Sequence, residues 1–344
     1  MKIIIAIFIF SVIILFHELG HFLFAKKCNV KVNEFSLGLG PNLISWGKGE
    51  TKYCIKLFPF GGACVMEGED EESDNDRAFN KKTVWERFQI VFAGPFFNFI
   101  MAFVLSVIYI GLIGADLPYI GDVIEGYAAE EAGLEAGDKI IKMDNYNVHF
   151  YNEVRLYTTF HSGKTIDVTY ERDNQRYKAS LVPKYSEENN AYLIGITSTG
   201  ELTKLSLLKT LEYGFYEVKY QIYITGQSLK MLFTGQLSVN DMSGPVGIVD
   251  TFSTVYDQSV VDGYFYVFIN FLSLTILLSA NLGVMNLLPF PALDGGRIFL
   301  LAIEAIRGKK MKAEIENGIN LVGFALLMGL MVFVMFNDIT KLIH

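Results

Sequence analysis

Residues 3–25 read IIIAIFIFSVIILFHELGHFLFA, an apolar run that contains the motif HELGH at 17–21. The run is long enough to cross a bilayer as an α-helix. On a helix, residues four apart share a face, so the imidazoles of His17 and His21 can reach one metal ion, with Glu18 beside them as a general base. Ionisable groups at membrane depth are costly and usually functional. The stretch therefore predicts a metal site inside a spanning helix.

The composition of the chain is also that of a membrane protein. The 344 residues are 51% hydrophobic, the mean hydropathy is +0.32, and further apolar runs lie at about 88–114, 264–288 and 318–337. Each run is long enough to span a membrane. The net charge of −8 offers no basic surface for nucleic acid. We expect a polytopic α-helical membrane protein with four transmembrane helices, the lipid bilayer around it and no nucleic-acid partner.

Lysine and arginine gather in two of the predicted loops, at 26–87 and 297–312. The positive-inside rule places such loops in the cytosol. Both termini and the middle region, about 115–262, then lie on the extracytoplasmic side. All three cysteines fall between residues 28 and 64, in the first basic loop. Free thiols fit a reducing compartment, so the cysteines support the same orientation.

Two histidines need a third protein ligand if one coordination position is to stay open. The third apolar run ends in NLLPFPALDGG (286–296), where Asp294 is the only acidic residue between Asp262 and Glu304. Two prolines break the helix here, and broken membrane helices are tolerated where they line a cavity. Asp294 can alternatively cap the helix that follows. Because HELGH is present in the same chain, we favour Asp294 as the third ligand.

Two further features of the N-terminal half bear on the site. Residues 53–66, YCIKLFPFGGACVM, predict a β-hairpin, because two β-prone arms flank a proline and two glycines. Asn98 is an amide inside the second apolar run. It can make a hydrogen bond between packed helices, or it can contact a substrate, and both roles stay open.

The middle region changes to short alternating segments. The fragment AGLEAGDKIIKMD (132–144) resembles the core of a PDZ domain, and residues 165–172 alternate as a strand. PDZ domains bind extended peptides by β-augmentation; a small α+β spacer domain without a ligand is the alternative. Residues 203–235 predict an amphipathic helix that lies on the membrane or packs on the PDZ-like domain. The predicted parts are an N-terminal membrane half (1–114), an extracytoplasmic PDZ-like α+β domain (115–200), an amphipathic connector (201–262) and a C-terminal membrane half (263–344).

Together these motifs resemble the site-2 protease family of intramembrane zinc metalloproteases. HELGH and NLLPFPALDGG match its paired site motifs, and KLFPFGGACVMEGE (56–69) is similar to its re-entrant β-hairpin. FSLGLGPNL (35–43), FAGPFFN (92–98) and SGPVGI (243–248) match further segments. The similarity covers essentially the whole chain and points to the RseP-type bacterial branch. The best-known members of that branch carry two tandem PDZ domains, whereas this chain has room for one.

The resemblance implies a zinc-dependent intramembrane endopeptidase of the bacterial cytoplasmic (inner) membrane. His17, His21 and Asp294 would hold Zn²⁺, and Glu18 would be the catalytic base. The substrates would be single-span membrane proteins already trimmed outside the membrane, typically anti-sigma factors, together with remnant signal peptides. An unwound substrate would be held by the N-x-x-P segment and as an added strand at the hairpin. The substrate-binding residues expected on this basis are Asn286, Pro289, Gly61, Gly62, Ile55, Val65 and, as one of its two roles, Asn98.

Two other functions remain as alternatives. A membrane metalloprotease with a cytosolic active site also carries HExxH near a span, but its third ligand is a glutamate on a later soluble helix. Here the apolar run reaches to within one residue of His17, and the best third ligand is Asp294. A non-enzymatic receptor could use the PDZ-like domain to bind peptide tails, but an intact Glu18 argues against it. Bound zinc would separate the enzymes from the receptor.

Overall fold

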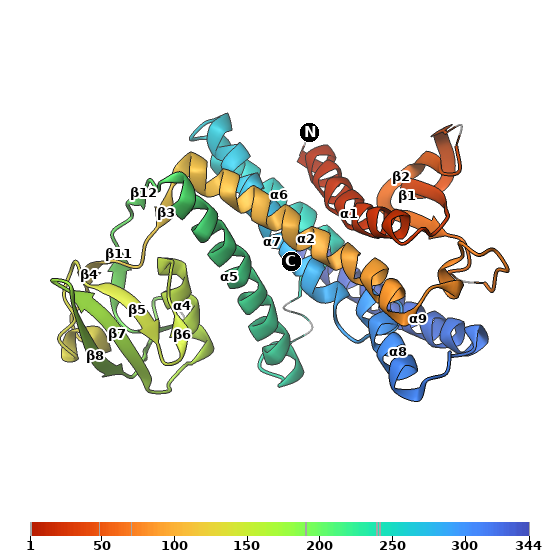
Figure 1. The fold of residues 1–344 in the computed structure, drawn as a ribbon. Coiled ribbons are helices and arrows are strands. Elements are labelled where there is room, and N and C mark those ends of the chain that lie inside the picture. Colours follow the sequence, from red (N-terminus) through yellow and green to blue (C-terminus); the bar gives the residue numbers. More distant parts are fainter. Residues whose placement is uncertain are drawn as a thin grey trace. The chain divides into compact units, whose positions relative to one another are not determined.

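The computed structural model describes residues 2–47, 49–69, 71–189, 191–238, 240 and 242–343 (Figure 1). The chain divides into two compact units. The first unit combines Met1–Leu105 with Ser228–His344, and the second unit is Ser106–Gln227. The four-part division expected from the sequence stays a prediction. Each unit is described by itself below.

Among the described residues, four helices are long and apolar enough to cross a membrane, as the sequence predicts. They are α1 (Lys2–Lys27), α2 (Val84–Ile113), α7 (Tyr264–Asn286) and α9 (Ala313–Ile343). A capping box begins α2: the Thr83 N–H donates to Glu86 Oε2 over 2.9 Å, and the Glu86 N–H donates to the Thr83 hydroxyl over 3.3 Å. These caps explain why the helix starts before its apolar run does.

The predicted hairpin at 53–66 is wrong in its pairing. These residues belong to one strand, β2 (Lys52–Met66), and its partner is β1 (Val32–Trp46). Residues 34–37 of β1 lie between residues 62–65 and residues 52–55 of β2, so the two halves of β2 pair with β1 and not with each other. Both strands bend where glycines adopt positive φ, +89° at Gly38 and +84° at Gly61. The result is a small curled sheet against α1 (Figure 1).

In this curled sheet, residues 62–66 are an edge. They pair with β1 on one side, and no described strand pairs with them on the other. The Cβ that alanine would add at Gly62 would lie 3.0 Å from Glu18 Cγ. The edge therefore passes directly beside the HELGH segment of α1.

Among the described residues, the first unit also contains two shorter α-helices, which are not among the four predicted spans. They are α6 (Pro245–Val260) and α8 (Asp294–Arg307). In a buried ion pair, Arg87 of α2 donates to Glu304 of α8 over 3.1 Å, and the two side chains are 8% and 10% exposed. Removing one partner of such a pair typically costs about 3–5 kcal/mol. This pair therefore fixes α8, which carries Asp294 as its first residue, against α2.

The second unit is an α+β fold around a four-stranded sheet of order β6-β5-β7-β8. Its core contains Ile140, Met143, Val154 and Ile166, which are all at most 1% exposed. Predicted strand segments appear as β5 and β7. The elements are β3 (Ala115–Asp116), β4 (Ile120–Val123), α3 (Ala128–Glu131), β5 (Lys139–Met143), β6 (Tyr146–Asn147), α4 (Tyr151–Phe160), β7 (Ile166–Arg172), β8 (Gln175–Leu181), β9 (Lys184–Ser186), β10 (Ala191–Leu193), β11 (Ile196–Ser198), β12 (Leu202–Thr203) and the helix α5 (Leu207–Phe233).

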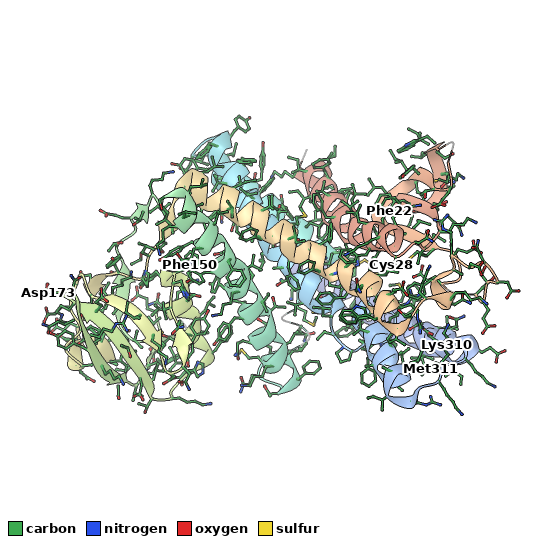
Figure 2. The ribbon with its side chains drawn as sticks, in the orientation of Figure 1. Phe22, Cys28, Phe150, Asp173, Lys310 and Met311 are labelled. Carbon is green, nitrogen blue, oxygen red and sulfur yellow. The ribbon has the colours of Figure 1, made fainter. Side chains whose placement is uncertain are left out.

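The predicted amphipathic helix is α5, and its aromatic face packs on the second unit. Phe150, labelled in Figure 2, meets Tyr213 edge-on with ring centroids 5.5 Å apart. His149 stacks on Tyr216 at 3.6 Å. Of the two expected positions for this helix, packing on the PDZ-like domain is therefore observed for the part of α5 inside this unit.

Candidate metal centre

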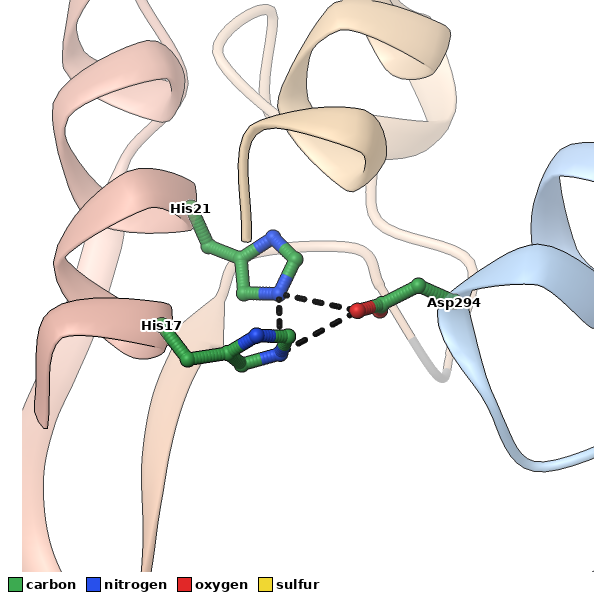
Figure 3. Close-up of side chains that lie close together, drawn as sticks. All are labelled: His17, His21 and Asp294. Carbon is green, nitrogen blue, oxygen red and sulfur yellow. Dashed lines mark hydrogen bonds and ion pairs between the residues drawn. The ribbon is translucent and has the colours of Figure 1, made fainter. Parts of the chain in front are cut away.

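Three side chains that are far apart in the sequence converge on one point (Figure 3). Nε2 of His17 lies 3.2 Å from Nε2 of His21. Oδ2 of Asp294 lies 3.1 Å from the first of these nitrogens and 3.5 Å from the second. The two histidines stand one turn apart on α1, and Asp294 is the first residue of α8. The structure thus brings together the three predicted ligands.

The interpretation of Asp294 as a helix cap does not fit its position. The residue before the helix is Leu293, and no side-chain hydrogen bond caps α8. Oδ2 of Asp294 is buried and has no hydrogen-bond partner in the described part of the chain. A buried carboxylate oxygen without a donor is costly, unless a cation occupies the space in front of it.

The spacing of the three atoms fits a metal ion. Two imidazole nitrogens and a carboxylate oxygen are all electron-pair donors, so they have no reason to gather unless protons or a cation lie between them. Four ligands placed tetrahedrally at zinc-ligand distances are about 3.3 Å from one another. The observed separations of 3.1 to 3.5 Å lie on both sides of that value. The donor set and its geometry both suit zinc.

The other ring nitrogen of each histidine has its own partner on α2. Nδ1 of His21 lies 2.9 Å from the backbone oxygen of Ile90. Nδ1 of His17 lies 3.1 Å from the side-chain amide of Asn98. Such outer contacts fix the orientation and the tautomer of metal-binding imidazoles.

Two glycines allow α1 and α2 to approach closely enough for these contacts. A Cβ at Gly20 of α1 would lie 2.2 Å from the backbone oxygen of Ala93. A Cβ at Gly94 of α2 would lie 2.3 Å from Nε2 of His21 and 2.9 Å from Cε1 of His17. Sequence reasoning missed both roles, although Gly20 lies inside HELGH and Gly94 lies inside FAGPFFN.

A cavity opens onto the three side chains, and Glu18 lines it together with residues from β2 and the end of α7. Glu18 is half-buried, whereas both histidines are buried. Burial raises the pKa of the Cys64 thiol, which also lines the cavity, and so favours the thiol over the thiolate. Of the two glutamates that line the cavity, Glu69 is paired with Arg297, and Glu18 is the one next to His17 in the chain.

The predicted substrate-binding residues do not all reach this cavity. Asn286, Gly62 and Val65 line it. Asn98 is fully buried behind His17, and its side chain faces that histidine rather than the cavity. The remaining three lie outside the cavity lining: Pro289, Gly61 and Ile55.

A paired-histidine helix facing a carboxylate, within a set of membrane-type helices, defines a membrane metalloprotein. The model of peptidase family M50 matches residues 5–330. The chain belongs to peptidase family M50, the site-2 protease family that its motifs resemble. The predicted recognition and the predicted class of enzyme, a metalloendopeptidase, are thereby confirmed.

Named relatives match over nearly their whole length. A candidate zinc metalloprotease of Clostridium acetobutylicum is 40% identical and covers 98% of this chain and 97% of its own. Zinc metalloprotease RasP of Bacillus licheniformis is 31% identical, with 98% of each chain covered. The regulator of sigma-W protease RasP of Bacillus subtilis is 30% identical, with 98% and 97% covered. Among solved structures, the PDZ domain of an SdrC-like protein of Listeria innocua is 26% identical over 26% of this chain and 100% of its own, with a TM-score of 0.23.

Gly94→Ala should weaken metal binding without unfolding the protein. The added Cβ must push both imidazoles aside, and we expect a loss of metal affinity of roughly ten- to a hundred-fold, as for changes that disturb ligand orientation. Metal analysis of the purified protein measures this. Gly111→Ala on the same helix is the matched control, because its Cβ would come no closer than 3.8 Å to Thr210 Cγ2. Equal metal content in the two variants would contradict the steric argument.

Proposed function

We propose that this protein is a zinc-dependent intramembrane endopeptidase that cleaves single-span membrane proteins. The observation that supports it best is the meeting of His17, His21 and Asp294 at ligand spacing, on helices apolar enough to span a bilayer. Its relatives are named zinc metalloproteases. A non-enzymatic receptor that binds peptides through the PDZ-like domain would need no metal-ligand cluster, so we do not favour that alternative.

His17, His21 and Asp294 would hold the zinc. A histidine that binds through Nε2 carries its proton on Nδ1, which then needs an acceptor. His21 has the backbone oxygen of Ile90 for this. For His17 the acceptor would be the side-chain amide of Asn98, whose nitrogen lies 3.1 Å from Nδ1 and whose oxygen has no described partner; turning the amide over exchanges these two atoms and places its oxygen against Nδ1. We therefore assign Asn98 to orienting His17 rather than to binding the substrate.

The chemical step needs a base, an oriented peptide bond and a proton donor for the leaving group. When bound, zinc activates a water molecule and polarises the scissile carbonyl. Glu18, one residue from His17 and open to the cavity, takes the proton of the attacking water. It then passes that proton to the leaving amine, which leaves as the C–N bond breaks.

The substrate must be unwound, because a helix hides its carbonyls in hydrogen bonds. We propose that it adds as a strand to the edge at 62–66, which lies beside Glu18. The direction of each backbone group on this edge can be worked out. The Glu67 N–H donates to the Lys31 oxygen over 2.9 Å, so it points toward β1. Backbone groups alternate along a strand, so those of Gly62, Cys64 and Met66 point away from β1, toward the substrate.

The second unit would be a single PDZ-like domain that screens or binds the extracytoplasmic part of a substrate. Alignments with the Bacillus relatives run over 420 positions, more than the 344 residues of this chain, so those relatives contain a segment that this chain lacks. One hydrophobic core around one four-stranded sheet in this unit supports a single PDZ-like domain here. Anti-sigma factors are the proposed substrates, because one relative is named a regulator of sigma-W protease; remnant signal peptides are a second class.

We place the protein in the bacterial cytoplasmic membrane with both termini outside. The β1–β2 sheet would enter the membrane from the cytosolic side, since Leu39, Leu43, Ile44 and Phe58 at its far end are all more than half exposed. These apolar side chains must contact either water or lipid, and contact with lipid has the lower free energy.

This orientation predicts that a cysteine introduced at Ser162 reacts with a membrane-impermeant thiol reagent added outside intact cells. Ser162 is exposed in the second unit, so its reaction reports only the side of the membrane. Lys309→Cys, exposed in the second basic loop, is the control and should react only after the cells are opened. The reverse pattern would overturn the proposed topology.

Glu18→Gln should abolish cleavage and keep zinc. Glutamine has nearly the same shape but cannot accept the proton, and a general base contributes roughly 10²- to 10⁴-fold. His17→Ala is the matched comparison and should lose both cleavage and zinc. Metal analysis and cleavage of a co-expressed single-span substrate measure the two effects. A Glu18→Gln protein that cleaves at more than a few per cent of the native rate would show that another residue is the base.

Cys64→Pro should sharply reduce cleavage, because proline removes an N–H that points at the substrate. Loss of this backbone hydrogen bond is expected to slow cleavage roughly ten-fold. Cys64→Ala keeps the N–H and should cleave nearly normally. Zinc content should stay near native in both. Ile55→Pro does not test strand addition, because Ile55 already pairs with Leu37 on one side and with Ile44 on the other and so lies on no edge. Normal cleavage by folded Cys64→Pro would rule out strand addition at this edge.

A further inference from the structure

The carboxylate of Glu69 lies at the C-terminal end of the edge formed by residues 62–66. Glu69 follows Met66 by three residues, and its Oε2 accepts the Met66 N–H over 3.3 Å. Its Oε1 forms an ion pair with Nη1 of Arg297. The Glu69 side chain is 15% exposed and that of Arg297 is 25% exposed. The pair is thus largely withdrawn from solvent, where an ion pair holds its geometry better than on the surface.

Arg297 connects this carboxylate to the candidate metal centre. It stands three residues after Asp294 on α8, so the two side chains share a face of that helix. Glu69 and Arg297 both line the cavity that contains His17 and Glu18. The ion pair therefore joins the end of the edge strand to the helix that carries the third ligand.

The hydrogen bond from Met66 is the one that a substrate strand would compete for. The backbone groups that point outward belong to Gly62, Cys64 and Met66, and Glu69 already accepts the last of the three N–H groups. An added strand can then use Gly62 and Cys64 but must end before Met66. Without Glu69, the same strand could also pair with Met66.

We propose that Glu69, held by Arg297, is a stop that sets the register of the bound substrate and so selects the peptide bond that is cut. This proposal rests on the proposed function. Registers that keep the same hydrogen-bonding and side-chain faces differ by two residues. Two residues of a β-strand span about 6.8 Å. In any one register, therefore, only one of two peptide bonds that far apart can lie beside Glu18. A fixed stop therefore gives one cleavage position, and its loss gives a second one two residues away.

The test uses the full-length protein with its zinc in detergent. The probe is a synthetic single-span peptide of leucine and alanine with a central Gly-Ser pair, and mass spectrometry identifies the cleaved bonds. Wild type and Glu71→Ala, an exposed acid two residues further along the same loop, should cut predominantly at one bond. In Glu69→Ala, the share of cleavage at a bond two residues away should rise roughly five-fold, as expected when one competing hydrogen bond is lost.

Two further variants separate the roles of the pair. Glu69→Gln keeps an oxygen for the Met66 N–H, so it should retain the single position. Arg297→Gln frees the carboxylate and should shift cleavage in the same direction as Glu69→Ala. The proposal is overturned if zinc-loaded Glu69→Ala cuts the same bond in the same proportion as wild type, or if it loses zinc and cleavage together. A wild-type protein that holds no zinc or cuts no single-span peptide would instead refute the proposed function itself.

Discussion

At the crossing of α1 and α2, the two helices approach so closely that neither can carry a side chain there. Gly20 lies against the Ala93 backbone, and Gly94 lies against both imidazoles. This approach brings Nδ1 of His21 to the oxygen of Ile90 and brings the Asn98 amide to His17. Since these contacts fix both rings, the orientation of two of the three proposed ligands depends on the crossing.

The third proposed ligand and the substrate edge depend on polar contacts made around that crossing. The buried pair of Arg87 and Glu304 holds α8 against α2, and the pair of Arg297 and Glu69 holds α8 against the end of β2. One face of α8 thus carries Asp294 and both of these partners. A short helix can place a ligand accurately only when such contacts restrain it, because its own hydrogen bonds leave its direction free.

Much of this could be predicted from local pattern, and the errors had a common cause. The four spans follow from uninterrupted apolar runs, and the histidine pair follows from spacing on one helix face. The hairpin at 53–66 failed because β-propensity and turn residues show that a segment is extended but not which segment pairs with it. A helix after Asp294 was expected, because Asp294 could cap it, but the sequence did not show that Asp294 would be the first residue of that helix and not its cap.

The sequence by itself determined what is written in one element: the membrane helices, the two imidazoles on one face of α1, Glu18 beside them and Asp294 as the available acid. Only the tertiary structure decided which elements meet. It placed Asp294 within 3.5 Å of both histidines, placed the Asn98 side chain against His17 and made residues 62–66 an edge beside Glu18. The physical reason is that spacing along a helix or strand is set by local geometry, whereas contacts between elements depend on packing across tens or hundreds of residues.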